Sequence, residues 1–574
     1  MSTRRDFLQM LGVAASSGIL FRPAFGLSRF PGNPYDLPEF GNATILHLTD
    51  CHAQLLPTYY REPDTNIGVG SAKGKIPHVV GHNYLDRFSL VKGTPEAYAF
   101  THLDFPELAK RYGKTGGFAH LASLVNRIRA QRGAENCLFL DGGDSWQGSA
   151  TALWTKGKDM VGAANLLGVD AMTGHWEFTY GEDTLVKNVE CFNGEFIAQN
   201  IRATEEALFS GIHLHDEEYG YVFKPYILRE IGNRRIAVIG QAFPYTPIAN
   251  PKRFIPNWRF GIQEVELQQL VTRIRTMHKP DAVLLLSHNG MDVDLKLGSR
   301  VTGIDLILGG HTHDAVPQPV LVSNRGGKTI VTNGGSNGKF LAVCDLDIGK
   351  GRIRDFRYRL LPVFSQLLEE DSTMSAYIKN IRAPYRARLE TKLAVTEGVL
   401  YRRGNFDGTF DRLICDALRT VLGAEISFSP GFRWGTTLLP GEIVTQEAVM
   451  SQTAITYPET YVRHLSGLEI KNILEDVADN IFNSNPYYQQ GGDMIRLSGL
   501  SYRIEPRHSI GNRISNLRLS KGVVIEKRKK YTVAGWGAVN SVATGSPVWE
   551  VLSEYLVKTG RIQPIQLHSP EMST

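Results

Sequence analysis

The sequence has few cysteines and no long hydrophobic run. The chain has 574 residues but only 5 cysteines, an odd number with no Cys-x-x-Cys pair. Such spacing defines neither a disulfide framework nor a zinc knot; one disulfide is compatible with an oxidising compartment, but we expect all five to be buried. They are Cys51, Cys137, Cys191, Cys344 and Cys415. No stretch approaches the roughly 18–20 apolar residues of a membrane helix, so we expect no span in the mature chain.

The sequence also lacks a strong excess of charge. It has 63 Lys and Arg against 58 Asp and Glu, a formal net charge of +5, which is too small to indicate a nucleic-acid-binding protein. Hydrophobic residues make up 42% and charged residues 21%, the proportions of a folded globular protein rather than a disordered one. We find no internal repeat, and the length predicts two to four domains.

The N-terminal residues have the pattern of an export signal. Arg4 and Arg5 precede Phe7 and a short apolar run over residues 10–20, with small residues near Ala24. We interpret residues 1–26 as a signal peptide that resembles twin-arginine signals, which carry folded proteins to the periplasm. The alternative is an unprocessed basic tail. Folding before export would let a protein acquire its metal in the cytoplasm, away from copper and zinc.

Short β-rich runs recur between residues 44 and 364, separated by turns or helical stretches. This rhythm predicts a layered α/β or α+β domain over residues 41–365. Residues 57–101, rich in Gly, Pro, Tyr and His, form an inserted segment that is too long for a simple turn and is typical of a functional lid or binding loop; a passive surface insertion is the alternative. The charged, helical pattern of residues 366–393 predicts a linker helix that Pro384 interrupts. We expect residues 394–569 to form a second domain.

Potential metal ligands follow the predicted strands of the first domain. Because the carboxyl ends of such strands form the binding crevice of layered α/β folds, we expect these side chains to converge. Asp50 and His52 are two residues apart, and on an extended segment both would point to one face, as would His311 and His313. The cluster comprises Asp50, His52, Asp141, Asp144, His175, Glu177, His288, His311 and His313.

This donor set indicates a hydrolytic metal centre. Carboxylates and imidazoles without thiolates suit manganese, iron or zinc. Two ions that share a bridging carboxylate can convert water into a hydroxide nucleophile at neutral pH and hold an anionic substrate. A single histidine at a strand end is usually structural, but convergence of this many residues favours catalysis.

The motifs resemble those of the calcineurin-like metallophosphoesterases, specifically the 5′-nucleotidase family. The similar motifs are Asp50-Cys51-His52, Gly142-Gly143-Asp144, Ser287-His288-Asn289-Gly290 and Gly309-Gly310-His311-Thr312-His313. The resemblance implies a β-sandwich flanked by helices, followed by an α/β substrate-binding domain. It assigns one metal to Asp50, His52, Asp144 and His313, and the other to Asp144, His175, His288 and His311, with Asp144 bridging.

One departure from that family concerns the substrate. Nucleotidases carry Gly-Asn-His-Glu where this chain has Gly174-His175-Trp176-Glu177. The surrounding string, with Ser429 to Gly435, resembles the SoxB family of thiosulfohydrolases, which implies two manganese ions and release of sulfate from a cysteine S-thiosulfonate on a SoxYZ-type carrier. Trp176 takes the place of the histidine in the nucleotidase motif. A persulfide leaves without the acid assistance that an alkoxide needs, so the loss of that histidine fits the reaction. We hypothesise that Trp176 forms an apolar wall of the site; core packing is the alternative.

The second domain supplies candidate substrate contacts. Arg433 can pair with sulfonate oxygens through its planar guanidinium, Trp434 can line an apolar wall, and Arg403 is a third candidate. For Arg402 and Arg496 we favour solvated surface charges.

Two alternative functions remain open at the level of sequence. One is a periplasmic 5′-nucleotidase or related phosphoesterase, which Trp176 opposes. The other is a non-catalytic carrier-binding or metal-storage protein, which the complete ligand set opposes.

Overall fold

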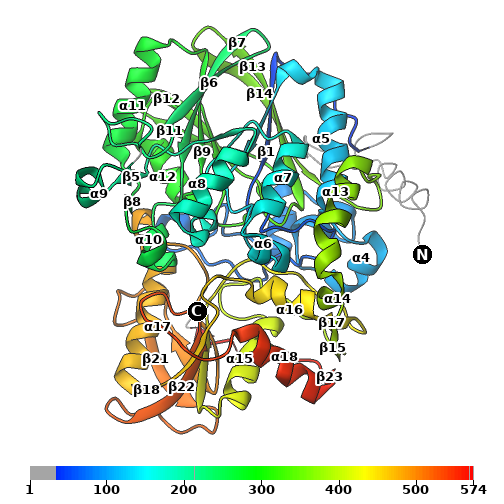
Figure 1. The fold of residues 1–574 in the computed structure, drawn as a ribbon, viewed down its shortest axis with the longest axis vertical. Coiled ribbons are helices and arrows are strands. Elements are labelled where there is room, and N and C mark those ends of the chain that lie inside the picture. Colours follow the sequence, from blue (N-terminus) through cyan, green and yellow to red (C-terminus); the bar gives the residue numbers. More distant parts are fainter. Residues whose placement is uncertain (1–33, 213, 568, 573–574) are drawn as a thin grey trace. The chain divides into compact units, whose positions relative to one another are not determined.

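The computed structural model describes residues 34–212, 214–567 and 569–572, so the predicted signal peptide lies outside the described residues. The chain divides into two compact units (Figure 1). The first contains the described residues up to Thr58, His82–Gln147 and Trp154–Arg382, and the second contains Tyr59–Gly81, Gly148–Leu153 and the chain from Ala383 onward. Strands and helices alternate in both units, which confirms the α/β class.

The first unit is built on two six-stranded sheets that lie next to each other, with α11 and α12 outside one and α5, α7 and α13 outside the other (Figure 1). The first sheet has the order β14 (Arg352–Pro362), β13 (Phe340–Gly349), β1 (Ala43–Leu48), β2 (Cys137–Asp141), β3 (Ala171–Met172), β4 (Glu195–Phe196). The second has the order β11 (Val320–Asn324), β12 (Gly327–Asn333), β10 (Leu306–Gly309), β9 (Ala282–Ser287), β7 (Arg234–Gln241), β6 (Tyr226–Ile231). This arrangement confirms the predicted sandwich flanked by helices.

The central strands are parallel, and their sequences explain why. β1 is apolar except for Thr44 and His47, and β9 is apolar up to Ser287; both strands are buried along their whole length, as expected for strands covered on both faces. β1 pairs in parallel with β2, and β9 pairs in parallel with β7 and β10. Each sheet therefore presents its carboxyl strand ends at one edge, where the candidate ligands follow β1, β2, β9 and β10.

Helices of the first unit cover the sheets and connect successive strands. α12, for example, packs against β10, β11 and β12. The longer helices are α2 (Gly81–Phe88), α4 (Phe105–Tyr112), α5 (Phe118–Arg132), α7 (Lys158–Leu167), α8 (Glu182–Cys191), α11 (Glu264–Met277), α12 (Met291–Arg300) and α13 (Ser372–Arg382). The shorter ones are α3 (Pro95–Phe100), α9 (Glu205–Phe209) and α10 (Thr246–Ala249), while most of α6 (Ala150–Thr155) belongs to the second unit.

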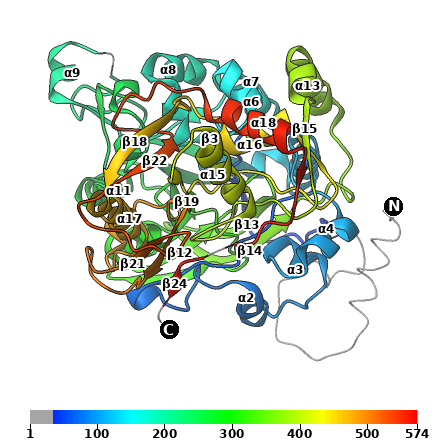
Figure 2. The ribbon, with the colours of Figure 1, turned by 90° about the horizontal axis from the view of Figure 1, so that it is seen from below.

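The second unit has a four-stranded sheet, β18 (Thr460–Ser466), β22 (Lys530–Trp536), β16 (Ile426–Ser429), β19 (Arg496–Ser498), and helices α15 and α17 (Figure 2). α15 (Thr409–Val421) buries apolar residues at helical spacing, among them Phe410, Leu413, Ile414, Ala417 and Leu418. α17 (Gly467–Phe482) begins at a capping box formed by Ser466 and Glu469. The remaining elements are β15 (Lys392–Thr396), β17 (Ile443–Thr445), β20 (Leu500–Ile504), β21 (Ile514–Leu519), β23 (Arg561–Ile562), β24 (Glu571–Met572), α14 (Arg386–Leu389), α16 (Gln446–Thr453) and α18 (Val548–Thr559).

The inserted segment 57–101 is divided between the units. Residues 59–81 belong to the second unit, where Val69 joins an apolar core with Phe406 and Phe482. Tyr59 forms a β-bridge with Thr437. The later part of the segment forms α2 and α3 in the first unit, and all six residues of α3 are buried. The earlier part of the segment therefore packs into the second unit, and the later part packs into the first.

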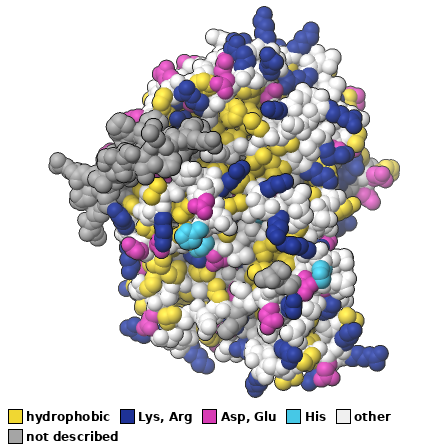
Figure 3. Space-filling model, turned by 180° about the vertical axis from the view of Figure 1, so that it is seen from behind, with side chains coloured by type: hydrophobic (Ala, Val, Ile, Leu, Met, Phe, Trp, Pro, Cys, Tyr) yellow, Lys and Arg dark blue, Asp and Glu magenta, His cyan; other side chains and the backbone are white. Residues whose placement is uncertain are grey.

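The structure bears on three expectations from composition. Cys191 is exposed, so the prediction that all five cysteines are buried is wrong; the other four are buried, and all five are free. None of the helices in the described part of the chain is both long and apolar enough to cross a membrane. The face in Figure 3 carries interspersed basic and acidic side chains, in keeping with the small net charge.

Candidate metal centre

The candidate ligands lie on tight loops rather than on extended strand ends. β1 ends at Leu48 and β10 at Gly309, and five of the seven predicted ligands have a left-handed backbone, with φ of 53° at Asp50, 45° at His52, 58° at Asp144, 72° at His311 and 58° at His313. The expectation that each Asp-x-His or His-x-His pair is extended is therefore wrong. Each such residue costs about 1–2 kcal/mol, a strain that is typical of functional sites.

Backbone hydrogen bonds hold the first two loops against each other. The amides of Asp50, His52 and Ala53 donate to the carbonyl oxygens of Gly143, Asp144 and Ser145 at 2.8, 2.8 and 3.1 Å. The amide of His311 donates to both carboxylate oxygens of Asp50, at 3.1 and 2.9 Å. The strained loops thus fix one another.

All seven predicted ligands converge in two buried groups. Asp50, His52, Asp144 and His313 form one group, and Asp144, His175, His288 and His311 form the other; within each group the ligand atoms lie within 4.8 Å of one another. These are the two sets that the sequence resemblance assigns. Each group can hold one metal ion, and Asp144 belongs to both.

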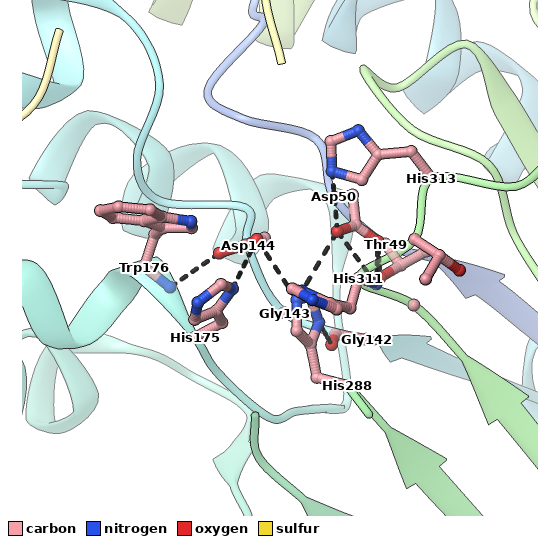
Figure 4. A network of polar contacts seen from close by, with 12 residues as sticks. Thr49, Asp50, Gly142, Gly143, Asp144, His175, Trp176, His288, His311 and His313 are labelled. Carbon is pink, nitrogen blue, oxygen red and sulfur yellow. Dashed lines mark hydrogen bonds and ion pairs between the residues drawn. The ribbon is translucent and has the colours of Figure 1, made fainter. Parts of the chain in front are cut away.

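One oxygen of Asp144 lies at the junction of the groups (Figure 4). Its Oδ2 is 3.0 Å from His175 Nδ1, 3.2 Å from His288 Nε2 and 3.7 Å from His52 Nε2. On the other side, His313 Nε2 lies 3.2 Å from Asp50 Oδ1 and 3.0 Å from His52 Nε2. Ligands placed about 2.0–2.2 Å from a shared ion have about these separations from one another, so the donor set fits two cations.

The electrostatics of the site also favour cations. Burial lowers the pKa of His288, but the carboxylates of Asp50 and Asp144 outweigh it and raise this pKa to about 10. Burial raises the pKa of Asp144, yet His175, His288 and His52 hold it well below its usual range. Two buried carboxylates therefore attract positive charge strongly, and a divalent cation can take the place of the proton.

Neighbouring polar groups orient the ligands. Thr49 Oγ1 donates to Asp50 Oδ2 at 2.6 Å, and His288 Nδ1 lies 2.6 Å from the carbonyl oxygen of Gly142. The amide of Trp176 donates to Asp144 Oδ1 at 2.7 Å, which directs Oδ2 toward the two groups. Such partners fix the rotamer and the tautomer of a metal ligand.

Glu177 is a supporting residue whose role sequence analysis missed. Its fully buried carboxylate accepts four backbone hydrogen bonds, from Asp144 and His175 to Oε2 at 3.2 and 2.8 Å and from Ser145 and Trp146 to Oε1 at 2.7 and 3.1 Å. It therefore ties the Asp144 loop to the His175 loop. Its position two residues after His175 was the available signal, but sequence cannot tell a ligand from an acceptor of amides.

Trp176 places its side chain beside the centre. The residue is 5% exposed, and its indole lies 5.4 Å from the His175 ring, centroid to centroid. Phe243 packs on the same histidine at 4.0 Å and stacks on His311 at 4.1 Å. Sequence analysis did not identify Phe243, which follows β7 by two residues and carries no polar signal.

The predicted substrate contacts of the second unit lie on two neighbouring loops. Arg433 Nε is 3.4 Å from Asp493 Oδ1, and Arg433 Nη2 donates to the Gly492 carbonyl at 2.6 Å. Arg403 is buried, and Trp434 is buried with its ring stacked on Phe432 at 4.1 Å.

Arg402 and Arg496 are not solvated surface residues, so that expectation is wrong. Both are buried and paired with Asp411, through Arg402 Nε to Oδ1 at 2.7 Å and Arg496 Nε to Oδ2 at 3.2 Å. Asp411 lies on the buried face of α15, and a charge there must be paired. The sequence pattern of that face, which is mainly apolar, concealed this requirement.

We predict that Asp144→Asn abolishes binding of both ions, because the amide removes the anionic oxygen that the two groups share. Metal content after dialysis, measured by plasma mass spectrometry, should fall from about two ions per chain to near zero. Asp347→Asn is the control, since Asp347 pairs with Arg354 at the surface. Retention of one ion by the Asp144 variant would contradict the bridging role.

We predict that Glu177→Gln destabilises the first unit by about 1–3 kcal/mol, because the amide nitrogen cannot accept the backbone hydrogen bonds that one oxygen accepted. Metal affinity should fall by about 10–100-fold as the His175 loop shifts. Thermal unfolding and metal titration measure both effects. Glu182→Gln is the matched control, since Glu182 accepts from the backbone and side chain of Asn257, away from the candidate ligands; an equal loss of affinity there would contradict the assignment.

Sequence comparisons match both units to known proteins. Residues 390–553 match the profile of the 5′-nucleotidase C-terminal domain. The UshA protein of Yersinia enterocolitica is 24% identical over 79% of this chain and 88% of its own length. A snake venom 5′-nucleotidase from Naja atra is 31% identical, over 34% of this chain and 35% of that enzyme. The chain thus spans about a third of the venom enzyme.

A solved structure matches almost the whole chain. The sulfate thiohydrolase SoxB of Thermus thermophilus, in complex with glycerol, is 37% identical, with a TM-score of 0.87 and coverage of 94% of this chain and 98% of that one. This likeness includes both units and confirms the resemblance inferred from the motifs. The chain belongs to the SoxB branch of the 5′-nucleotidase family, whose members are hydrolases.

Proposed function

We propose that this protein is a periplasmic thiosulfohydrolase with two manganese ions, which hydrolyses a cysteine S-thiosulfonate on a SoxYZ-type carrier and releases sulfate. The observation that carries the proposal is Trp176. Its amide donates to Asp144, the carboxylate that both ligand groups share, and its indole lies beside the His175 ring. In nucleotidases the position of Trp176 is taken by the histidine of Gly-Asn-His-Glu. The similarity to a sulfate thiohydrolase over both units supports the same reaction.

The proposed reaction transfers the sulfonate group to water. An oxygen–sulfur bond forms between water and the terminal sulfonate sulfur, and the bond from that sulfur to the adjacent sulfane sulfur breaks. Water loses its protons, sulfate is released, and the electron pair of the broken bond stays on the sulfane sulfur as a carrier-bound persulfide. A persulfide is a weak base, so it leaves without an acid at the position of Trp176.

The residues of this chain have distinct tasks in that reaction. Two bound cations lower the pKa of water and neutralise charge on an anionic group. Asp144 and Asp50 hold the site anionic enough to attract them, while Thr49 and the Trp176 amide orient those carboxylates. The rings of Trp176 and Phe243 supply apolar surface next to the ligands, and Arg433 is the proposed partner of the sulfonate oxygens.

Manganese and the periplasm are linked in the proposal. Carboxylate and imidazole ligands accept manganese, iron or zinc, and zinc binds more tightly than manganese at equilibrium. Export of the folded protein through residues 1–26 would allow manganese to be acquired before the protein meets the metals of the periplasm.

A direct test follows sulfate release from a carrier cysteine S-thiosulfonate and phosphate release from AMP with the same manganese-loaded protein. We predict sulfate without phosphate. Phosphate without sulfate would contradict the proposal and favour a 5′-nucleotidase, the second candidate, which the match of residues 390–553 to a 5′-nucleotidase domain supports.

We predict that Trp176→His keeps the metal centre, because the amide that holds Asp144 is a backbone group, but changes the substrate preference. The new imidazole can stabilise charge at a phosphoryl group, so phosphatase activity should rise by about 10²-fold or more while thiosulfonate hydrolysis falls. Trp176→Phe is the control, since it keeps an apolar ring. Full thiosulfonate hydrolysis without any gain of phosphatase activity in the histidine variant would contradict the proposed role.

A further inference from the structure

Asp493 is a buried carboxylate at the point where two loops of the second unit meet strand β19. It is 4% exposed. Its Oδ1 accepts from Asn405 Nδ2 at 3.2 Å and lies 3.4 Å from Arg433 Nε, and its Oδ2 lies 3.0 Å from Arg496 Nη2. One side chain therefore contacts the loop of Arg403, the loop of Arg433 and strand β19.

Backbone contacts hold these loops at a fixed separation. The amide of Asp493 donates to the Gly431 carbonyl at 2.9 Å, and the amide of Met494 donates to the Asn405 carbonyl at 2.9 Å. A Cβ atom at Gly431 would lie 2.3 Å from the Asp493 carbonyl oxygen, so only glycine permits this approach. Asn405 Oδ1 also accepts from the amide of Ile67 at 2.6 Å, which joins the inserted segment to the same cluster.

The ion pairs around Asp493 form an alternating chain that runs from Arg402 through Asp411, Arg496 and Asp493 to Arg433. This row of ion pairs contains three guanidinium groups and two carboxylates, so the row has an excess of one positive charge. Four of its side chains are at most 2% exposed, whereas Arg433 is 11% exposed. Among these five side chains, Arg433 is therefore the one that solvent reaches most. Burial raises the pKa of Asp493, but Arg433, Arg496 and Arg403 hold it below its usual value, so this carboxyl stays ionised.

Two contacts define the orientation of the Arg433 guanidinium. Its Nε faces Asp493, and its Nη2 donates to the Gly492 carbonyl at 2.6 Å. A planar group held at two points has a fixed plane, which a lysine ammonium in the same place would not have. Preorganisation of this kind removes the entropy cost of ordering a long side chain when an anion binds.

We infer that Asp493 is a positioning residue, which holds Arg433 in the orientation in which it binds the anionic end of the substrate. This inference rests on the proposed function, in which Arg433 pairs with the sulfonate. Asp493 itself touches no reacting atom and acts only through Arg433.

The inference is tested by a double-mutant cycle of Asp493→Asn and Arg433→Gln in the manganese-loaded full chain, with kcat and KM for thiosulfonate hydrolysis as the readout. Each single variant should lower kcat/KM by about 10–100-fold, mainly through KM, since a misplaced binding group costs about that much. In the Arg433→Gln background, Asp493→Asn should have no further effect. Asp479→Asn is the matched control: Asp479 pairs with Arg513 at 2.7 Å elsewhere in the unit, and its loss should leave both constants unchanged.

An undiminished effect of Asp493→Asn in the Arg433→Gln background would overturn the inference, because Asp493 would then act independently of Arg433. If Asp493→Asn does not fold, Arg433→Lys replaces it; full activity of that variant would show that an oriented guanidinium is not needed. If the wild-type protein releases phosphate from AMP and no sulfate, the proposed function fails, and the same cycle measured on AMP tests the role of Asp493 separately.

Discussion

The sharing of one carboxylate between two ligand groups is the interaction on which the rest of the structure depends. Asp144 Oδ2 lies within 3.0–3.7 Å of three imidazoles, and its Oδ1 is held by the amide of Trp176. A second carboxylate, Asp50, belongs to the same centre; its Oδ2 accepts from Thr49 Oγ1, and both of its oxygens accept from the His311 amide. Two buried anions in one place are costly unless cations neutralise them, so the fold and the metal content are coupled.

The fold supplies this arrangement through parallel strands and strained loops. β1 and β2 in one sheet and β9 and β10 in the other end at the same edge, which brings together segments far apart in sequence. The left-handed residues turn the ligand side chains inward. Their backbone strain is offset by the hydrogen bonds between the backbones of the two loops and by the backbone hydrogen bonds that Glu177 accepts. A rigid scaffold thus carries a centre that is strained, buried and polar, a combination that loops alone would not sustain.

Much of this could be predicted from sequence. Mainly apolar segments such as those of β1 and β9 predict the strands, because buried strands are built from few residue types. Short motifs, of which Gly309 to His313 is one, together predict the seven candidate ligands, because few residue types bind metal ions. Backbone conformation was not predictable in the same way: Asp50 and His52 were expected on an extended segment and are in fact left-handed. Buried partners were also hidden, since Glu177, Arg402 and Arg496 are charged residues whose burial depends on contacts made by distant parts of the chain.

The most direct test of the account is anomalous X-ray diffraction from crystals of the manganese-loaded protein, recorded on both sides of the manganese absorption edge. The account predicts two manganese peaks, one surrounded by Asp50, His52, Asp144 and His313 and the other by Asp144, His175, His288 and His311, with Asp144 touching both. A single peak, or two peaks of which only one contacts Asp144, would contradict it.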